Sequence, residues 1–232
     1  MSRTVLLHPL GTDSRCWDDV RLGAGSFAID LPGHGGAPAL PRGADVADFA
    51  AVVADALDGE RVHVVGASLG GLVAQHLAAE YPGLVDRLVL VDTVTVYPGQ
   101  MRRMWRERAA MARDRGLAEL ADPMAAMWFT APFAAGPVAA RIREWFLAMD
   151  PESYARACEA LATADTTGAV IAAPTLVVCG SADLPPFTDG ARLLHERIAG
   201  AELAWLDGKH AAFLERAAAF GAELRRFLAL DS

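Results

Sequence analysis

The sequence predicts a doubly wound α/β fold, a mainly parallel sheet of about six strands flanked by helices, with a helical insertion. Three observations lead to this prediction. Short apolar runs alternate with segments of helical periodicity, and several of these runs lack polar alternation. One long interval contains helix signals but no convincing strand. A chain of 232 residues is long enough for one well-buried domain.

The strands are predicted from six short apolar runs, at residues 4–7, 27–30, 62–65, 88–91, 175–178 and 203–206. Runs without polar residues suit strands that are buried on both faces, as in a parallel sheet covered by helices. Helices are predicted at 46–57, 70–81, 191–198 and 211–228. Because the first run begins at about Thr4, we expect no β-hairpin before it.

The insertion is predicted over residues 93–173, which are rich in Met, Trp and Phe. Several short helices are expected there, because the interval contains these helix breakers: Pro98, Gly116, Pro123, Pro132, Gly136, Pro137 and Pro151. So long a connection suits a cap over the strand ends. We therefore predict one domain with an insertion: a core of residues 1–92 and 174–232, and a helical cap of residues 93–173.

Composition and charge exclude several classes of protein. A net charge of −8 argues against a nucleic-acid binder, and the arginines of residues 102–115 are interrupted by Glu107 and Asp114, as on a solvated helix face. No apolar run is long enough for a signal peptide or a membrane span. Three widely spaced cysteines suggest reduced thiols. We expect a soluble, cytoplasmic protein without a membrane or nucleic-acid partner; the oligomeric state stays open.

Residues 66–70, G-A-S-L-G, contain the main chemical signal. They follow a predicted strand and precede a predicted helix, which is the context that gives the G-x-S-x-G motif its meaning. Small residues around Ser68 allow the strand and the helix to approach closely. The sequence therefore predicts Ser68 as a nucleophile; the alternative is a strand–helix turn with a solvent-facing serine.

A serine nucleophile needs a base, and in this fold the base should come late in the chain. Of the six histidines, only His210 is both late and at the end of a predicted strand. His8 and His34 precede Ser68, and the remaining three lie within predicted strands or helices. We predict His210 as the base.

The base needs an acid that orients it, and chain order places this acid between Ser68 and His210. Asp183 follows the strand predicted at 175–178 and is the preferred candidate. Asp92, at the end of the strand predicted at 88–91, is the rival. The alternative for each is an aspartate that caps a turn or a helix.

Two backbone N–H groups are expected to bind the oxyanion. One belongs to Leu69, directly after the serine. The other should come from the loop after the first strand, where Pro9 has no N–H and Leu10 is the better candidate. No step of this chemistry needs a metal ion or a cofactor, so none is expected.

The chain resembles the α/β-hydrolase superfamily in these segments, in the expected order: H-P-L-G at 8–11, L-P-G-H-G at 31–35, G-A-S-L-G at 66–70, G-S-A-D at 180–183 and G-K-H at 208–210. A narrower resemblance is to 3-oxoadipate enol-lactonases, through residues 10–13 with Trp17 and Asp18, and through M-W-F-T at 127–130 and residues 154–165 in the cap. These resemblances imply a serine hydrolase.

The resemblance also bears on the substrate pocket. It suggests Trp128, Met127 and Phe129 as substrate-binding residues; the alternative is that the aromatic residues form the core of the cap. The enol-lactonases usually have an arginine before this tryptophan, suited to a substrate carboxylate, and Met127 replaces it here. Arg102, Arg103 or Arg141 are candidates for a substitute cation.

The leading hypothesis is a cofactor-independent serine hydrolase that cleaves a small ester or lactone through an acyl-enzyme, as an enol-lactonase would. One alternative is a carboxylesterase or thioesterase for a neutral biosynthetic substrate, which Met127 suits better than an anionic one. A second alternative, of another class, is a hydrolase fold that binds a ligand without turning it over.

Overall fold

Six parallel strands form the centre of the molecule. The computed structural model describes residues 2–20, 22–23 and 25–230. Its strands are β1 Thr4–Leu7, β2 Ser26–Ile29, β3 Val62–Ala67, β4 Val85–Val91, β5 Thr175–Gly180 and β6 Glu202–Leu206. They form one sheet in the order β2-β1-β3-β4-β5-β6, and every neighbouring pair is parallel. The prediction of a mainly parallel sheet of about six strands is confirmed.

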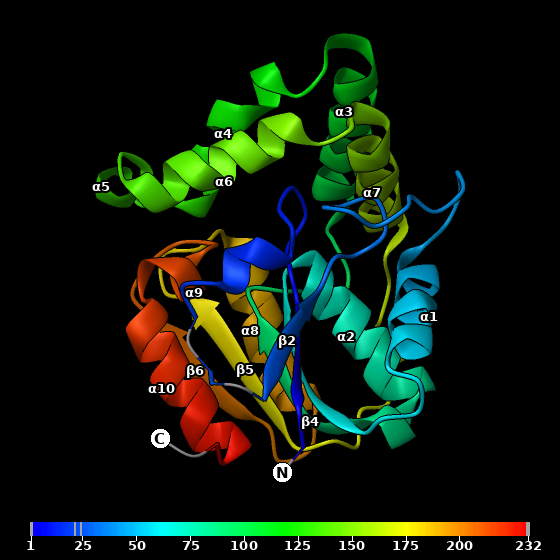
Figure 1. Cartoon of the computed structure of the whole chain (residues 1–232), viewed down its shortest axis with the longest axis vertical. Helices are drawn as coiled ribbons and strands as arrows, with labels where there is room; N and C mark the ends of the chain where they lie inside the picture. The colour runs from blue at the N-terminus through cyan, green and yellow to red at the C-terminus, as the bar shows by residue number, and fades with distance from the viewer. Residues whose placement is uncertain (1, 21, 24, 231–232) are drawn as a thin grey trace.

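Helices cover both faces of this sheet. Figure 1 shows α10 (Ala217–Leu228) on one side and α1 (Val46–Ala56) and α2 (Leu69–Glu80) on the other. The remaining helices of the core are α8 (Pro185–Arg197), the short α9 (Ala212–Glu215) and two 3₁₀ turns, η1 (Ser14–Trp17) and η2 (Pro82–Leu84). Because both faces are covered, β1, β3 and β5 are buried along their whole length, as the absence of polar alternation predicted.

The strand register brings the carboxyl ends of the strands to one edge of the sheet. Leu7, near the end of β1, pairs with Gly66 in β3, and Val91, at the end of β4, pairs with Val178 in β5. The segments that follow these strands therefore meet above the same edge, where ligand sites of such sheets form.

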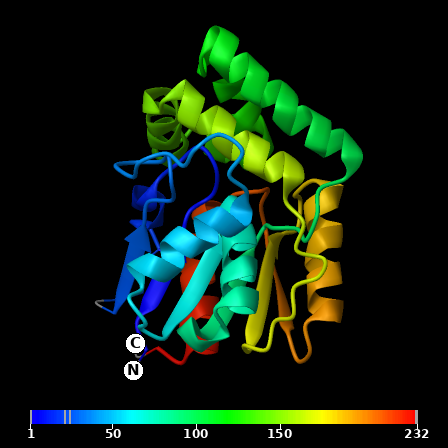
Figure 2. The same cartoon turned by 90° about the vertical axis from the view of Figure 1, so that its right-hand side faces the viewer.

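Five helices lie over this edge and form the layer at the top of Figures 1 and 2. They are α3 Gly99–Arg115, α4 Ala118–Trp128, α5 Ala131–Ala134, α6 Pro137–Ala148 and α7 Pro151–Thr163. The name "cap" is used below for residues 93–173. The division of the chain into a core and a cap stays a prediction.

Several expectations about the helices are wrong, and some of them involve proline. Helix α3 has 17 residues and is longer than the short helices expected. Pro123 lies inside α4, whereas Pro137 and Pro151 lie in the first turns of α6 and α7. A proline in the first turn loses no helical hydrogen bond, so it marks a helix start instead of a break. The same reason moves the start of α8 from the predicted residue 191 back to Pro185.

The last predicted helix, at 211–228, is two helices in the structure. Arg216, with φ −125° and ψ 41°, separates α9 from α10. Alanine-rich periodicity continues through this break, so the sequence pattern does not reveal it. Among the helices that the structure describes, none has the length and apolar character needed to cross a membrane.

Candidate active site

Ser68 lies on the sharp turn between β3 and α2. Its backbone has φ 51° and ψ −109°, a positive φ that non-glycine residues rarely adopt. The small neighbours are required by space. A Cβ atom on Gly66 would collide with the backbone of Gly70, and one on Gly70 would collide with the backbone of Leu7. Such strain at a polar residue is typical of functional sites.

The side chain of Ser68 contacts His210, which contacts Asp183. His210 Nε2 lies 3.0 Å from Ser68 Oγ, and His210 Nδ1 lies 2.8 Å from Asp183 Oδ2. The three residues follow β3, β6 and β5, so the parallel sheet brings together groups that are 27 and 142 residues apart in the chain. All three are buried. The structure thus joins the three sequence-predicted residues in one hydrogen-bonded chain.

The surroundings of His210 favour its charged form. Burial alone lowers the pKa of His210, but the charge of Asp183 and its hydrogen bond outweigh burial, so the pKa lies above its ordinary value. Phe187 lies with its ring centroid 4.2 Å from that of His210, and Trp128 lies 6.2 Å away. These rings shield the pair from water, which strengthens its electrostatic attraction.

Asp92, the rival acid, is buried close to this pair but contacts other groups. Its Oδ1 accepts a hydrogen bond of 2.7 Å from the Gly180 N–H, while its Oδ2 has no partner among the described residues. Burial and the neighbouring Asp183 raise the pKa of Asp92 well above its usual range. Burial and the charge of Asp183 thus oppose ionisation of Asp92, and Asp183 is the carboxylate that contacts the histidine.

One group of side chains has the spacing of a metal site but not its chemistry. The ligand atoms of Asp92, Cys179 and Asp183 all lie within 4.8 Å of one another. Metal ions need deprotonated ligands. Burial raises the pKa of the Cys179 thiol, and burial together with Asp183 raises the pKa of Asp92, so both groups resist deprotonation. Asp183 is already bonded to the histidine.

The loop after β1, residues 8–11, lies against the turn that contains Ser68, and hydrogen bonds of His8 hold it there. The Leu31 N–H donates to His8 Nε2 over 2.9 Å, so His8 Nδ1 carries the proton and donates to the Pro9 carbonyl. This bond keeps the loop with Leu10 beside Ser68. Leu69 is the first residue of α2, so its N–H has no acceptor within that helix.

A small pocket opens above Ser68 and has a volume of about 10 Å³. Its walls are Leu10, Ser68, Trp105, Arg108, Met124, Met127, Trp128, Tyr154 and His210. Met127 and Trp128 thus line it, as proposed from the sequence. Phe129 is not part of the wall; its buried ring packs 6.0 Å from Trp128 and 5.2 Å from Phe133. The space holds about one water molecule, so a substrate must displace cap side chains.

Sequence reasoning missed the contribution of α3 to this pocket. Arg108, within the arginine run expected to face solvent, lines the pocket and is half-buried, so that expectation is wrong at this position. The periodicity of the buried Met101, Trp105, Ala109 and Ala112 shows which face of α3 points inward. Position 108 lies next to this face, three residues after Trp105, and this was the signal available.

None of the three arginines considered earlier lines the pocket. Arg102 lies 3.9 Å from Asp165, and Arg141 lies 2.5 Å from Asp19. Arg103 is exposed.

Glu215, another residue that the sequence did not reveal, joins the cap to the histidine loop. Its Oε1 accepts hydrogen bonds from the N–H of Thr130, at 3.2 Å, and from the N–H of Lys209, at 3.1 Å. Its Oε2 accepts from the Thr130 hydroxyl. In addition, the Ala211 N–H donates to the Trp128 carbonyl over 2.9 Å. The buried carboxylate of Glu215 thus holds Thr130 of the cap against Lys209, the residue before His210.

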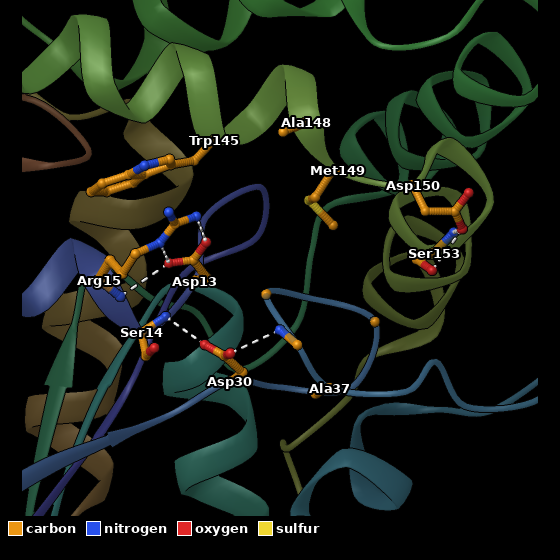
Figure 3. Close-up of a pocket in the computed structure, with 13 residues that line it drawn as sticks. Asp13, Ser14, Arg15, Asp30, Ala37, Trp145, Ala148, Met149, Asp150 and Ser153 are labelled. Atoms are coloured by element: carbon orange, nitrogen blue, oxygen red, sulfur yellow. Dashed lines mark hydrogen bonds and ion pairs between the residues drawn. The ribbon is translucent and has the colours of Figure 1, made fainter.

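A larger cavity of about 460 Å³ lies between the loops of the core and the helices α6 and α7 of the cap (Figure 3). Two of its charged groups, Arg15 and Asp13, pair with each other. Arg15 bonds both carboxylate oxygens of Asp13, and Trp145 lies over the Arg15 guanidinium with 4.6 Å to the ring centroid. Asp30 accepts from the N–H groups of Ser14 and Gly36. The charge of Arg15 is thus neutralised by Asp13, whereas Asp30 is bonded to neutral N–H groups.

Comparisons with known proteins agree with the fold and the order of the motifs. The model of the alpha/beta hydrolase family matches residues 4–223. The 3-oxoadipate enol-lactonase 2 of Acinetobacter baylyi (strain ATCC 33305 / BD413 / ADP1) is 30% identical over 170 residues, which cover 70% of this chain and 63% of that enzyme. The pimeloyl-[acyl-carrier protein] methyl ester esterase of Neisseria meningitidis serogroup B (strain ATCC BAA-335 / MC58) is 29% identical over 242 residues, covering 98% and 93%.

Solved structures give the same result. The enol-lactonase from Burkholderia xenovorans LB400 superposes with a TM-score of 0.92 at 32% identity, over 98% of this chain and 91% of that one. Because the family model spans almost all of the described residues and the fold matches throughout, the chain belongs to the α/β-hydrolase family.

Proposed function

We propose that the protein is a serine hydrolase that cleaves a small ester or lactone through an acyl-enzyme. The observation that carries the proposal is the continuous hydrogen-bonded chain from Ser68 Oγ through His210 to Asp183, with heavy-atom distances of 3.0 and 2.8 Å. Hydroxyl, imidazole and carboxylate in this order form the arrangement that activates serine in acyl transfer.

In the first step Ser68 Oγ attacks the substrate carbonyl carbon while His210 Nε2 takes the hydroxyl proton. Asp183 holds the imidazole in the required tautomer and stabilises its positive charge. The N–H groups of Leu10 and Leu69 stabilise the oxyanion. The C–O bond of the ester then breaks, and His210 returns the proton to the leaving oxygen.

In the second step a water molecule attacks the acyl-enzyme. His210 takes a proton from this water, the bond between Ser68 Oγ and the acyl carbon breaks, and His210 gives the proton to Ser68 Oγ as the acid product leaves. For a lactone, the leaving oxygen stays tethered to the acyl group throughout. The two kinds of relatives reported above, enol-lactonases and a methyl ester esterase, support both substrate types.

The experiment compares the wild type with Ser68→Ala and with Ser26→Ala, a serine on β2 away from the site. We expect Ser68→Ala to abolish turnover of p-nitrophenyl acetate and covalent labelling by a fluorophosphonate, and Ser26→Ala to retain both. Labelling that persists in folded Ser68→Ala would exclude Ser68 as the nucleophile. A wild type that binds lactones but turns over neither lactones nor esters would instead support the non-catalytic alternative.

A panel of substrates tests the finer assignment. Formation of 3-oxoadipate from its enol-lactone would support an enol-lactonase. Efficient turnover of neutral esters or thioesters, with none of that lactone, would support the carboxylesterase or thioesterase alternative.

A further inference from the structure

The pocket above the serine is lined by one arginine, and this arginine has no carboxylate partner among the described residues. Arg108 projects from α3 into the same pocket as Ser68 and His210. No carboxylate of the described residues lies within ion-pair distance, 4.0 Å, of its guanidinium. By contrast, Arg113 of the same helix pairs with Glu152 and Glu159.

Arg108 is fixed in place by neutral groups. Its Nε and Nη2 donate hydrogen bonds of 3.0 and 2.8 Å to Tyr154 Oη, and its guanidinium carbon lies 5.7 Å from the ring centroid of Trp105. These bonds use two of its five N–H groups. A phenol and an indole ring orient the guanidinium without neutralising its charge, so the charge remains available to a ligand.

A second donor in the pocket also lacks an acceptor. The Trp105 side chain lines the pocket and is 4% exposed, and its Nε1–H has no hydrogen-bond partner among the described residues. A buried donor left without a partner costs about 1–3 kcal/mol. Other walls of the pocket are apolar, including Leu10, Met124 and Met127. The pocket therefore has donors in excess of acceptors, and a positive charge.

We propose that the substrate carries a carboxylate away from its scissile carbonyl, and that Arg108 binds this carboxylate, with the Trp105 N–H as a second donor. The inference rests on the proposed function and adds the substrate class: esters or lactones of dicarboxylic or keto acids. A carboxylate supplies the acceptors and the negative charge that the pocket lacks, and a guanidinium binds it with charge-assisted hydrogen bonds.

The test uses two matched esters, p-nitrophenyl hydrogen glutarate and a neutral isostere in which an isopropyl group replaces the free carboxyl group. In the wild type we expect a higher kcat/KM for the glutarate. Arg108→Met should lower kcat/KM for the glutarate about 10- to 100-fold and change that for the neutral ester less than about threefold. Arg106→Met, an exposed arginine of the same helix, is the control and should change neither.

Further variants separate charge from structure. Arg108→Lys keeps the charge and should recover part of the preference for the glutarate, and Tyr154→Phe, which removes only the neutral partner, should keep most of it. Equal losses on both esters in Arg108→Met, or a wild type that prefers the neutral ester, would overturn the inference.

Calorimetric binding of free glutarate distinguishes failure of this inference from failure of the proposed function. We expect glutarate to bind the wild type at least about tenfold more tightly than it binds Arg108→Met. Equal affinity would overturn the inference even if Ser68 hydrolyses neutral esters. Binding that depends on Arg108, without any turnover, would uphold the anion site and reject the hydrolase mechanism.

Discussion

Replacing Asp183 by asparagine tests how the charge of His210 is balanced. Asparagine keeps the shape of the side chain but removes the charge, and its amide can hold the imidazole in the wrong tautomer. Where no other carboxylate is near, this change costs about 10⁴-fold in kcat. Here Asp92 lies with its ligand atom no more than 4.8 Å from that of Asp183, so the outcome should differ.

The size of the difference follows from the repulsion between the two carboxyl groups. Two charges 4.8 Å apart repel by about 3.5 kcal/mol at an effective dielectric constant of about 20. Asp183→Asn removes this repulsion, so the pKa of Asp92 should fall. Asp92 also raises the pKa of His210, so its charge reaches the imidazole. Once ionised, it should partly replace the lost carboxylate.

We therefore expect Asp183→Asn to lower kcat/KM for p-nitrophenyl acetate by only about 10²- to 10³-fold, and Asp183→Asn/Asp92→Asn by about 10⁴-fold. Both are measured at pH 8 in a spectrophotometric assay, with melting temperatures to verify folding. A double variant no slower than the single one would refute the reasoning about Asp92. A single variant with wild-type activity would refute the role of Asp183.

Four further predictions follow from groups around the site. Because the base must be neutral and the pKa of His210 is raised, kcat/KM should fall on the acid side with an apparent pKa above 6.5, measured as a pH–rate profile; a midpoint below 6 would contradict this. Because the pKa of Asp92 is raised in the folded state, the folded protein loses stability as pH rises above about 3.8. The melting temperature of Asp92→Asn should therefore exceed that of the wild type by more at pH 8 than at pH 4.5. An equal difference at both pH values would contradict this prediction. Glu215→Gln weakens the buried contacts with Thr130 and Lys209 and should lower the free energy of unfolding, measured with urea, by about 1–3 kcal/mol. An unchanged free energy would show that these contacts contribute little. Met127→Ala should enlarge the 10 Å³ pocket and raise kcat/KM for p-nitrophenyl butyrate relative to acetate, and an unchanged ratio would place the acyl chain elsewhere.

The sheet was predictable because burial dictates its residues. Strands with helices on both faces need apolar side chains at every position, and the run at residues 62–65 has this form apart from His63. Helix ends were less predictable. Pro185 can begin a helix or end one, and only its place after β5 decides between the two. The break at Arg216 has no local signal, because alanine-rich helical periodicity continues on both sides of it.

The candidate site also has residues that the sequence could predict and residues that it could not. Ser68, Asp183 and His210 each follow a strand, so chain order and the edge of a parallel sheet were enough to bring them together. Arg108 comes from a helix of the cap, whose orientation over the sheet depends on packing between distant segments. Its contact with Tyr154, 46 residues later, left no trace in local periodicity.

The carboxylate of Glu215 has a mechanical consequence. It accepts hydrogen bonds from Thr130 of the cap and from the backbone N–H of Lys209, the residue directly before His210. If the cap moved away from the core at Thr130, it would therefore pull His210 away from Ser68. The serine would then lose its general base. Substrate entry should instead depend on flexible side chains such as Met124, which can change rotamer while the Glu215 contacts with Thr130 and Lys209 stay intact.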